Sequence, residues 1–122
     1  MLVALWIVNG LAALAFLAAG LMKATRPKEA LAANGMAWTE DFSAGSIKAI
    51  GALEVLGALG LILPLALGLA PILTPLAATG LAIIMLGAIV VHVRRKESAL
   101  PSIVLALVSI ASAVLGYLVV LG

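Results

Sequence analysis

Four long apolar runs constrain this chain more than any other feature of its sequence. They lie at Leu2–Met22, Ile47–Leu63, Ile72–Val93 and Ser102–Leu121. At 1.5 Å of helical rise per residue, the first run spans about 31 Å, close to the thickness of the hydrocarbon layer of a bilayer. Only 10% of the residues are charged, against about 25% in soluble domains, and 66% are hydrophobic. We therefore predict an all-α protein, a bundle of four transmembrane helices that forms a single domain over residues 1–122.

The cations of the chain predict its orientation. All seven Lys and Arg residues lie in or beside two connections, Lys23–Ser46 and Arg94–Pro101. Because the cytoplasmic loops of membrane proteins are enriched in Lys and Arg, we predict that both connections are cytoplasmic and both termini outside. The expected location is a cell membrane, and specifically the bacterial cytoplasmic membrane.

The connections carry local signals of their own. Pro27 is suited to open a short helix, and Gly35 is suited to end it in the left-handed conformation. Thr39, followed by two acidic residues, predicts the N-cap of the second long helix. The wholly apolar segment Pro64–Pro71 predicts a tight turn at the membrane surface, and Pro101 fits the first turn of the fourth helix.

Helical spacing predicts which faces meet at the centre of the bundle. The stripe on the fourth helix consists of small residues, which let transmembrane helices approach closely. The residues expected to face inward are Asn9, Ala13, Phe16, Gly20 and Lys23; Ile47, Ile50, Gly51, Glu54, Gly57, Ala58 and Leu61; Thr74, Leu81, Met85, Ala88 and His92; and Ser109, Ser112, Ala113 and Gly116.

Glu54 is the most informative of these residues. It lies about 10 Å inside the membrane, judged from helical rise, and an ionisable group at depth costs at least about 2.5 kcal/mol to insert. Such a group faces a cavity or a partner. It can transfer protons, anchor a hydroxyl or carbonyl of a ligand, or serve as counter-ion to a cationic substrate. The structural alternative is a neutral carboxyl that ties two helices together by hydrogen bonds.

Three further polar residues are candidates for ligand binding or proton transfer, each with a structural alternative. Lys23 either snorkels to the membrane surface or points inward at Glu54. His92 either stabilises the end of its helix or relays protons to Glu54. Asn9 is most simply a hydrogen-bonding link between helices. Lys48 lies on another face from Glu54 and reads as a charge at the membrane interface.

Several kinds of chemistry are disfavoured by composition. One histidine and no cysteine cannot build a structural zinc site or ligate a haem with two histidines. We therefore expect no metal site and no haem. The basic loops are small and poor in aromatic residues, so no nucleic-acid partner is expected.

Three segments resemble the DoxX-like family of small membrane proteins. Residues Ile50–Pro64 are similar to the family's second helix, Thr74–Arg95 to its third, and Gly20–Lys23 to the Gly-x-x-Lys end of its first. The resemblance implies a four-helix membrane bundle, and some relatives are named as subunits of quinone-linked membrane oxidoreductases. Others resemble membrane chaperones or cargo receptors, so the resemblance supplies no catalytic residues. It leaves open whether the chain is an enzyme.

The leading hypothesis is that the chain binds a lipophilic, quinone-like small molecule in a pocket in the cytoplasmic half of the bundle. It would then serve as an accessory subunit of a membrane redox system. The alternatives are a membrane assembly factor or chaperone-like protein, and a small proton-coupled transporter that uses Glu54. Expected partners are membrane lipid and the lipophilic molecule, with a second copy of the chain or a redox protein as further options.

Overall fold

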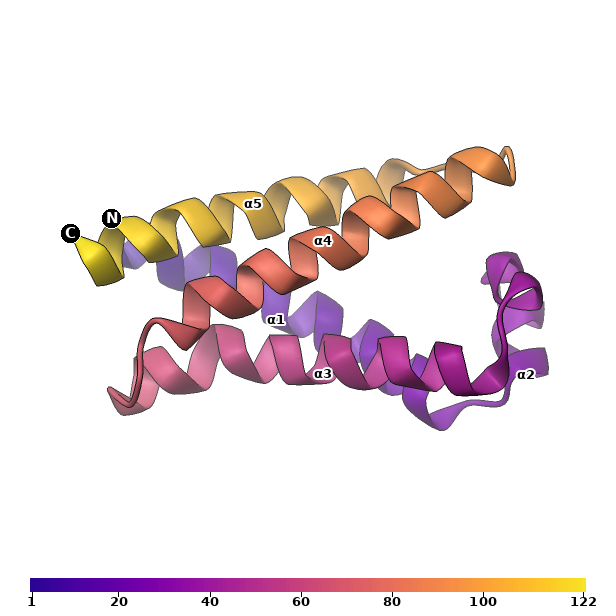
Figure 1. Cartoon of the computed structure of the whole chain (residues 1–122), viewed down its shortest axis with the longest axis horizontal. Helices are drawn as coiled ribbons and strands as arrows, with labels where there is room; N and C mark the ends of the chain where they lie inside the picture. The colour runs from indigo at the N-terminus through magenta and orange to yellow at the C-terminus, as the bar shows by residue number, and fades with distance from the viewer.

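The structure is a computed structural model that describes all of residues 1–122, and its only regular elements are helices, as predicted (Figure 1). Four helices are long and apolar enough to cross a membrane, which makes the chain a multi-pass membrane protein. The elements in chain order are α1 (Leu2–Thr25), α2 (Lys28–Ala33), the 3₁₀-helix η1 (Ala37–Asp41), α3 (Ala44–Leu67), α4 (Leu73–Arg94) and α5 (Leu100–Leu121).

The long helices associate as two pairs, α1 with α3 and α4 with α5. Both termini lie at one end of the bundle, while α2 and η1 lie at the other (Figure 1). Toward that second end, α4 and α5 separate from α3 (Figure 1). The helix pairs therefore lie together near the termini and diverge toward the long loop. We call the end of the bundle that holds α2 and η1 the loop end.

The predicted inward faces are largely confirmed. Leu61, Leu81 and Phe16 are fully buried, and most leucines on the opposite faces are exposed, where lipid would cover them. Ala12 is buried in place of the predicted Ala13. The core cluster consists of Ala12, Phe16, Ala58, Leu61, Ala78, Leu81, Met85 and Ala106. The predicted residues that are only half-buried are Ala13, Ile50, Gly57, Ala88, His92 and Ala113.

The start of α3 differs from the prediction. Thr39 does not cap the helix. It lies in η1, and its hydroxyl donates to the carbonyl of Met36 at 2.7 Å. The cap is Ser43, whose side-chain oxygen accepts from the amide of Ser46 at 3.1 Å. Both hydroxyls suit a cap, but only Ser43 has the extended backbone that an N-cap requires.

The end of α3 also differs from the prediction of a turn that begins at Pro64. The helix runs through this proline to Leu67 and ends where Gly68 adopts the left-handed conformation, with φ of 66°. Proline cannot donate a hydrogen bond to the carbonyl four residues earlier, which here is that of Gly60. Thr74 of α4 supplies the missing donor, since its hydroxyl lies 2.9 Å from this carbonyl oxygen. A neighbouring helix thereby satisfies the freed backbone group inside the membrane.

Candidate functional site

A cavity of about 690 Å³ lies between the two helix pairs at the loop end. All four long helices contribute to its wall, and residues beside and within η1 close one side. Its volume falls within the range of about 300–1,000 Å³ that is usual for small-molecule sites. Most of the lining is apolar or of small residues; the polar and aromatic side chains in it include Lys23, Trp38, Phe42, Glu54, His92 and Glu97.

The polar centre of the site depends on a close crossing of α1 and α3. A β-carbon added to Gly51 would lie 2.7 Å from the carbonyl oxygen of Gly20, and one added to Gly20 would lie 2.7 Å from that of Gly51. No side chain separates the backbones at this point. Lys23 follows Gly20 by about one turn, and Glu54 follows Gly51 by the same interval. The crossing therefore brings the two charged residues within reach of each other.

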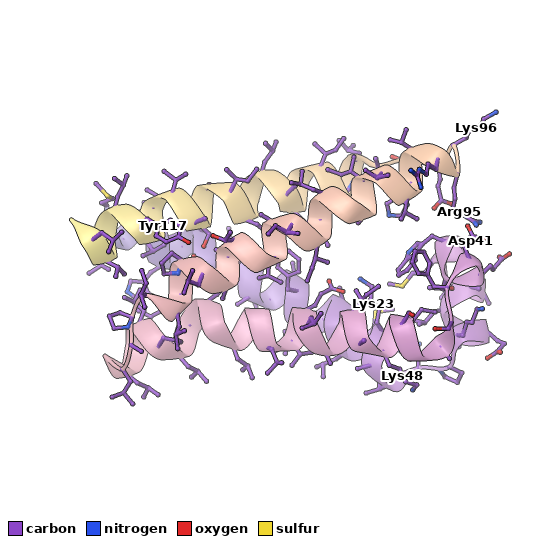
Figure 2. All side chains as sticks on the ribbon, in the orientation of Figure 1. Lys23, Asp41, Lys48, Arg95, Lys96 and Tyr117 are labelled. Carbon is purple, nitrogen blue, oxygen red and sulfur yellow. The ribbon has the colours of Figure 1, made fainter.

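Lys23 and Glu54 form a buried ion pair. The Lys23 Nζ donates to Glu54 Oε1 at 2.6 Å, and the exposed fractions of the residues are 8% and 0%. Figure 2 shows the Lys23 side chain in the space between α3 and α4. The ammonium also lies 5.5 Å from the centre of the Trp38 ring, within the range of a cation–π contact. The structure thus favours the inward reading of Lys23 over snorkelling to the membrane surface.

The second carboxylate oxygen of Glu54 has no partner. Glu54 Oε2 is buried and accepts no hydrogen bond, although the residue lines the cavity. A buried acceptor without a donor costs about 1–3 kcal/mol, and more when it is charged. The site therefore presents an unused acceptor directly beside an ammonium that retains unused donors.

His92 lines the same cavity without contacting Glu54. Its Nδ1 lies 2.9 Å from Glu97 Oε1, and its ring packs edge-on against Trp38 at 6.4 Å between centroids. A proton relay from His92 to Glu54 would need a bridging group in the cavity. The histidine therefore belongs to the wall of the site rather than to its charged pair.

Asn9 lies outside the cavity lining. Its Nδ2 donates to the carbonyl of Leu61 at 2.9 Å, and its Oδ1 accepts from the hydroxyl of Ser112 at 2.5 Å. The residue joins α1, α3 and α5 nearer the termini, as the reading of an interhelical link predicts. Both ends of its amide are already used within the bundle.

An ion pair crosses the loop end. Arg95, directly after α4, donates to Asp41 of η1, so the long loop is bound to the α4–α5 turn (Figure 2). The hydrogen bond with Asp41 raises the pKa of the Arg95 guanidinium above its ordinary value. Arg95 Nε also lies 3.5 Å from Glu97 Oε2, as an ion-pair contact without a hydrogen bond.

Sequence reasoning missed two parts of this site. Trp38 lies in the long loop between the first two apolar runs, and no local pattern there predicts a ring beside Lys23. The Asp41–Arg95 pair joins residues 54 positions apart, and opposite charge at one end of the bundle is the only signal for it. No three His, Cys, Asp or Glu side chains lie together in an arrangement that would ligate a metal ion.

Comparison with known proteins identifies one family. A family model described as the DoxX-like family matches residues 7–116. Neither the curated proteins nor the solved structures contain a match to the chain. The matched range includes all of α3 and α4, most of α1 and α5, and both residues of the Lys23–Glu54 pair.

Proposed function

Since the chain belongs to the DoxX-like family, we propose that it binds a lipophilic, quinone-like small molecule in the cavity beside Glu54. The observation that carries the proposal is the unpartnered Glu54 Oε2 next to the Lys23 ammonium. A carbonyl of the quinone would accept from the Lys23 ammonium, and a hydroxyl of the reduced hydroquinone would donate to Oε2. The reduced form would thereby satisfy the buried acceptor that the protein leaves open.

The rest of the lining supports a ring-shaped head group. Trp38 and Phe42 pack edge to face at 5.5 Å, and both line the cavity with His92. Aromatic pairs favour such offset and edge-on arrangements, so a third flat ring can add to this wall. Methionine and small residues on α4 leave the remaining space apolar and adaptable.

The closed half of the bundle supports binding rather than transport. Beyond the cavity, toward the termini, lie most of the core cluster and the hydrogen bonds of Asn9 to Leu61 and Ser112. A proton-coupled transporter needs access to its carboxyl from both sides of the membrane in turn, and this packed half would have to separate. We further propose that the protein is an accessory subunit of a membrane redox system and holds the ligand for a partner.

The two tryptophans provide an assay for binding. Trp38 lines the cavity, whereas Trp6 is near the start of α1 and does not. With the Trp6→Phe protein in lipid nanodiscs, we expect a tailless benzoquinone to quench Trp38 fluorescence saturably. The Trp38→Phe protein, which retains Trp6, should show only unsaturable quenching from quinone dissolved in the lipid. Identical quenching curves for the two tryptophans would refute the proposed site.

Two open glycines supply a matched pair of variants. A β-carbon at Gly87, which lines the cavity, or at Gly10, which does not, meets no atom within 4 Å. Gly87→Phe should therefore fill the cavity and abolish saturable quenching, and Gly10→Phe should leave it unchanged. Equal binding by both variants would contradict the assignment.

Glu54→Gln tests the role of the carboxylate. The amide can still accept from Lys23 but places an N–H₂ donor where Oε2 was an acceptor. The affinity for the reduced hydroquinone is measured by its competition with the quinone. We expect Glu54→Gln to weaken this affinity at least tenfold more than it weakens the affinity for the quinone. An unchanged ratio of the two affinities would show that Oε2 does not contact the ligand.

A further inference from the structure

A second hollow adjoins the cavity on the outer surface of the bundle. It is a groove of about 360 Å³ between α3 and α4, lined almost wholly by apolar side chains. Ile84 lines both the groove and the cavity, so the two hollows meet at this side chain. The groove therefore continues the cavity toward the lipid.

The dimensions of the groove suit one hydrocarbon chain. Its α4 wall runs from Ile84 to Leu73, which corresponds to about 16 Å of helical rise, or about half the hydrocarbon thickness. Its floor lies where Gly57 of α3 approaches Leu81 of α4, because a β-carbon on Gly57 would lie 2.6 Å from the Leu81 side chain. Leu73 and Leu76 are half-exposed along its rim.

We propose that the ligand is a single-tailed amphiphile, with its polar ring at Lys23 and Glu54 and its tail in the α3–α4 groove. This inference rests on the proposed function and adds the class of molecule and its direction. The head group, in its reduced form, donates to the buried Oε2 of Glu54, a residue that lines the cavity but not the groove. The tail then passes Ile84 and lies along α4 toward the α3–α4 turn, in contact with both protein and lipid.

Gly80 allows a selective test. It lines the groove but not the cavity, it is exposed, and a β-carbon added to it meets nothing within 4 Å. Gly80→Phe should therefore occupy the groove without moving the helices. Gly10→Phe makes the same substitution at an equally open glycine of α1 and serves as the control.

Two probes share one ring and differ only in the tail, a tailless benzoquinone and the same quinone with a ten-carbon chain. Their binding is measured by quenching of Trp38 in the Trp6→Phe background. Gly80→Phe should weaken the affinity for the tailed quinone by about tenfold, equivalent to about 1.4 kcal/mol, and leave the affinity for the tailless quinone unchanged. Gly10→Phe should change neither affinity.

The outcomes separate this inference from the function on which it rests. If the tailless quinone binds and Gly80→Phe does not change the affinity for the tailed quinone, the tail site alone is overturned. The groove would then hold ordinary lipid. The tail site is also refuted if Gly80→Phe weakens the affinities for both probes equally. Absence of saturable Trp38 quenching by the tailless quinone would instead overturn the proposed function itself.

Discussion

Removal of the Lys23 ammonium should destabilise the protein more than any other single change of charge. In Lys23→Met a flexible apolar chain replaces the lysine stem, and Oε1 of Glu54 loses its donor, so that neither carboxylate oxygen has a partner. Breaking a buried ion pair by removal of one partner costs about 3–5 kcal/mol. The adjoining cavity can admit water, and the isolated carboxylate can take up a proton, so we expect the lower end, about 3 kcal/mol.

The second variant in this test removes the charge that Lys23→Met leaves behind. Adding Glu54→Gln replaces a buried anion by a neutral amide of the same shape, whose unmet hydrogen bonds still cost about 1 kcal/mol. The double variant should therefore be about 2 kcal/mol more stable than Lys23→Met alone. Lys48→Met is the control, because Lys48 is exposed and its Nζ makes only a 3.4 Å contact with a backbone carbonyl.

Reversible unfolding in mixed micelles, followed by circular dichroism, gives the four free energies of the cycle. If the Lys23 and Glu54 substitutions add to within about 0.5 kcal/mol, the residues are not coupled and the reasoning fails. If Glu54 served only to tie helices together by hydrogen bonds, the variants would rank differently in stability. Glu54→Ala would then unfold the bundle, while Glu54→Gln would be silent in stability and in ligand binding.

Three further predictions test the packing and the orientation. Gly51→Ala should destabilise the protein by about 1 kcal/mol in the same unfolding assay. The cost of overpacking against the backbone of α1 should exceed the gain in helix propensity. A more stable variant would refute the close crossing. Gly116→Leu should lower the thermal stability in detergent, since its β-carbon would meet Pro75 at 2.9 Å, whereas exposed Val114→Leu should not; equal melting temperatures would contradict this. Ser98→Cys, the only thiol in such a chain, should resist an impermeant maleimide in intact cells, and labelling there would reverse the predicted topology.

The helices and their inward faces were predictable because each depends on local periodicity. An apolar run long enough to cross the membrane predicts a spanning helix, and a repeat of 3.6 residues predicts which side is buried. The same periodicity places Lys23 and Glu54 on the inward faces of their helices. The sequence left snorkelling and pairing as open alternatives for Lys23, because the outcome depends on how closely α1 and α3 approach.

The errors at the ends of α3 came from interactions that no local rule contains. Thr39 and Ser43 both suit a helix cap, and the 3₁₀-turn of η1 decides between them. Pro64 is an ordinary signal for a helix end, but Thr74 of another helix repairs the hydrogen bonding that the proline removes. Within a membrane such a substitute donor is strongly stabilising, since no water is present to donate a hydrogen bond to the freed carbonyl.

The charged pair also follows from the direction in which side chains leave a helix. Side chains lean toward the N-terminus of their own helix. Because α1 and α3 run in opposite directions, Lys23 lies on the loop-end side of the Gly20–Gly51 crossing and leans back toward it. Glu54 lies on the far side and leans toward the loop end. The two side chains therefore converge from both sides of one crossing, and this geometry requires that Gly20 and Gly51 hold the backbones close enough for the charges to meet.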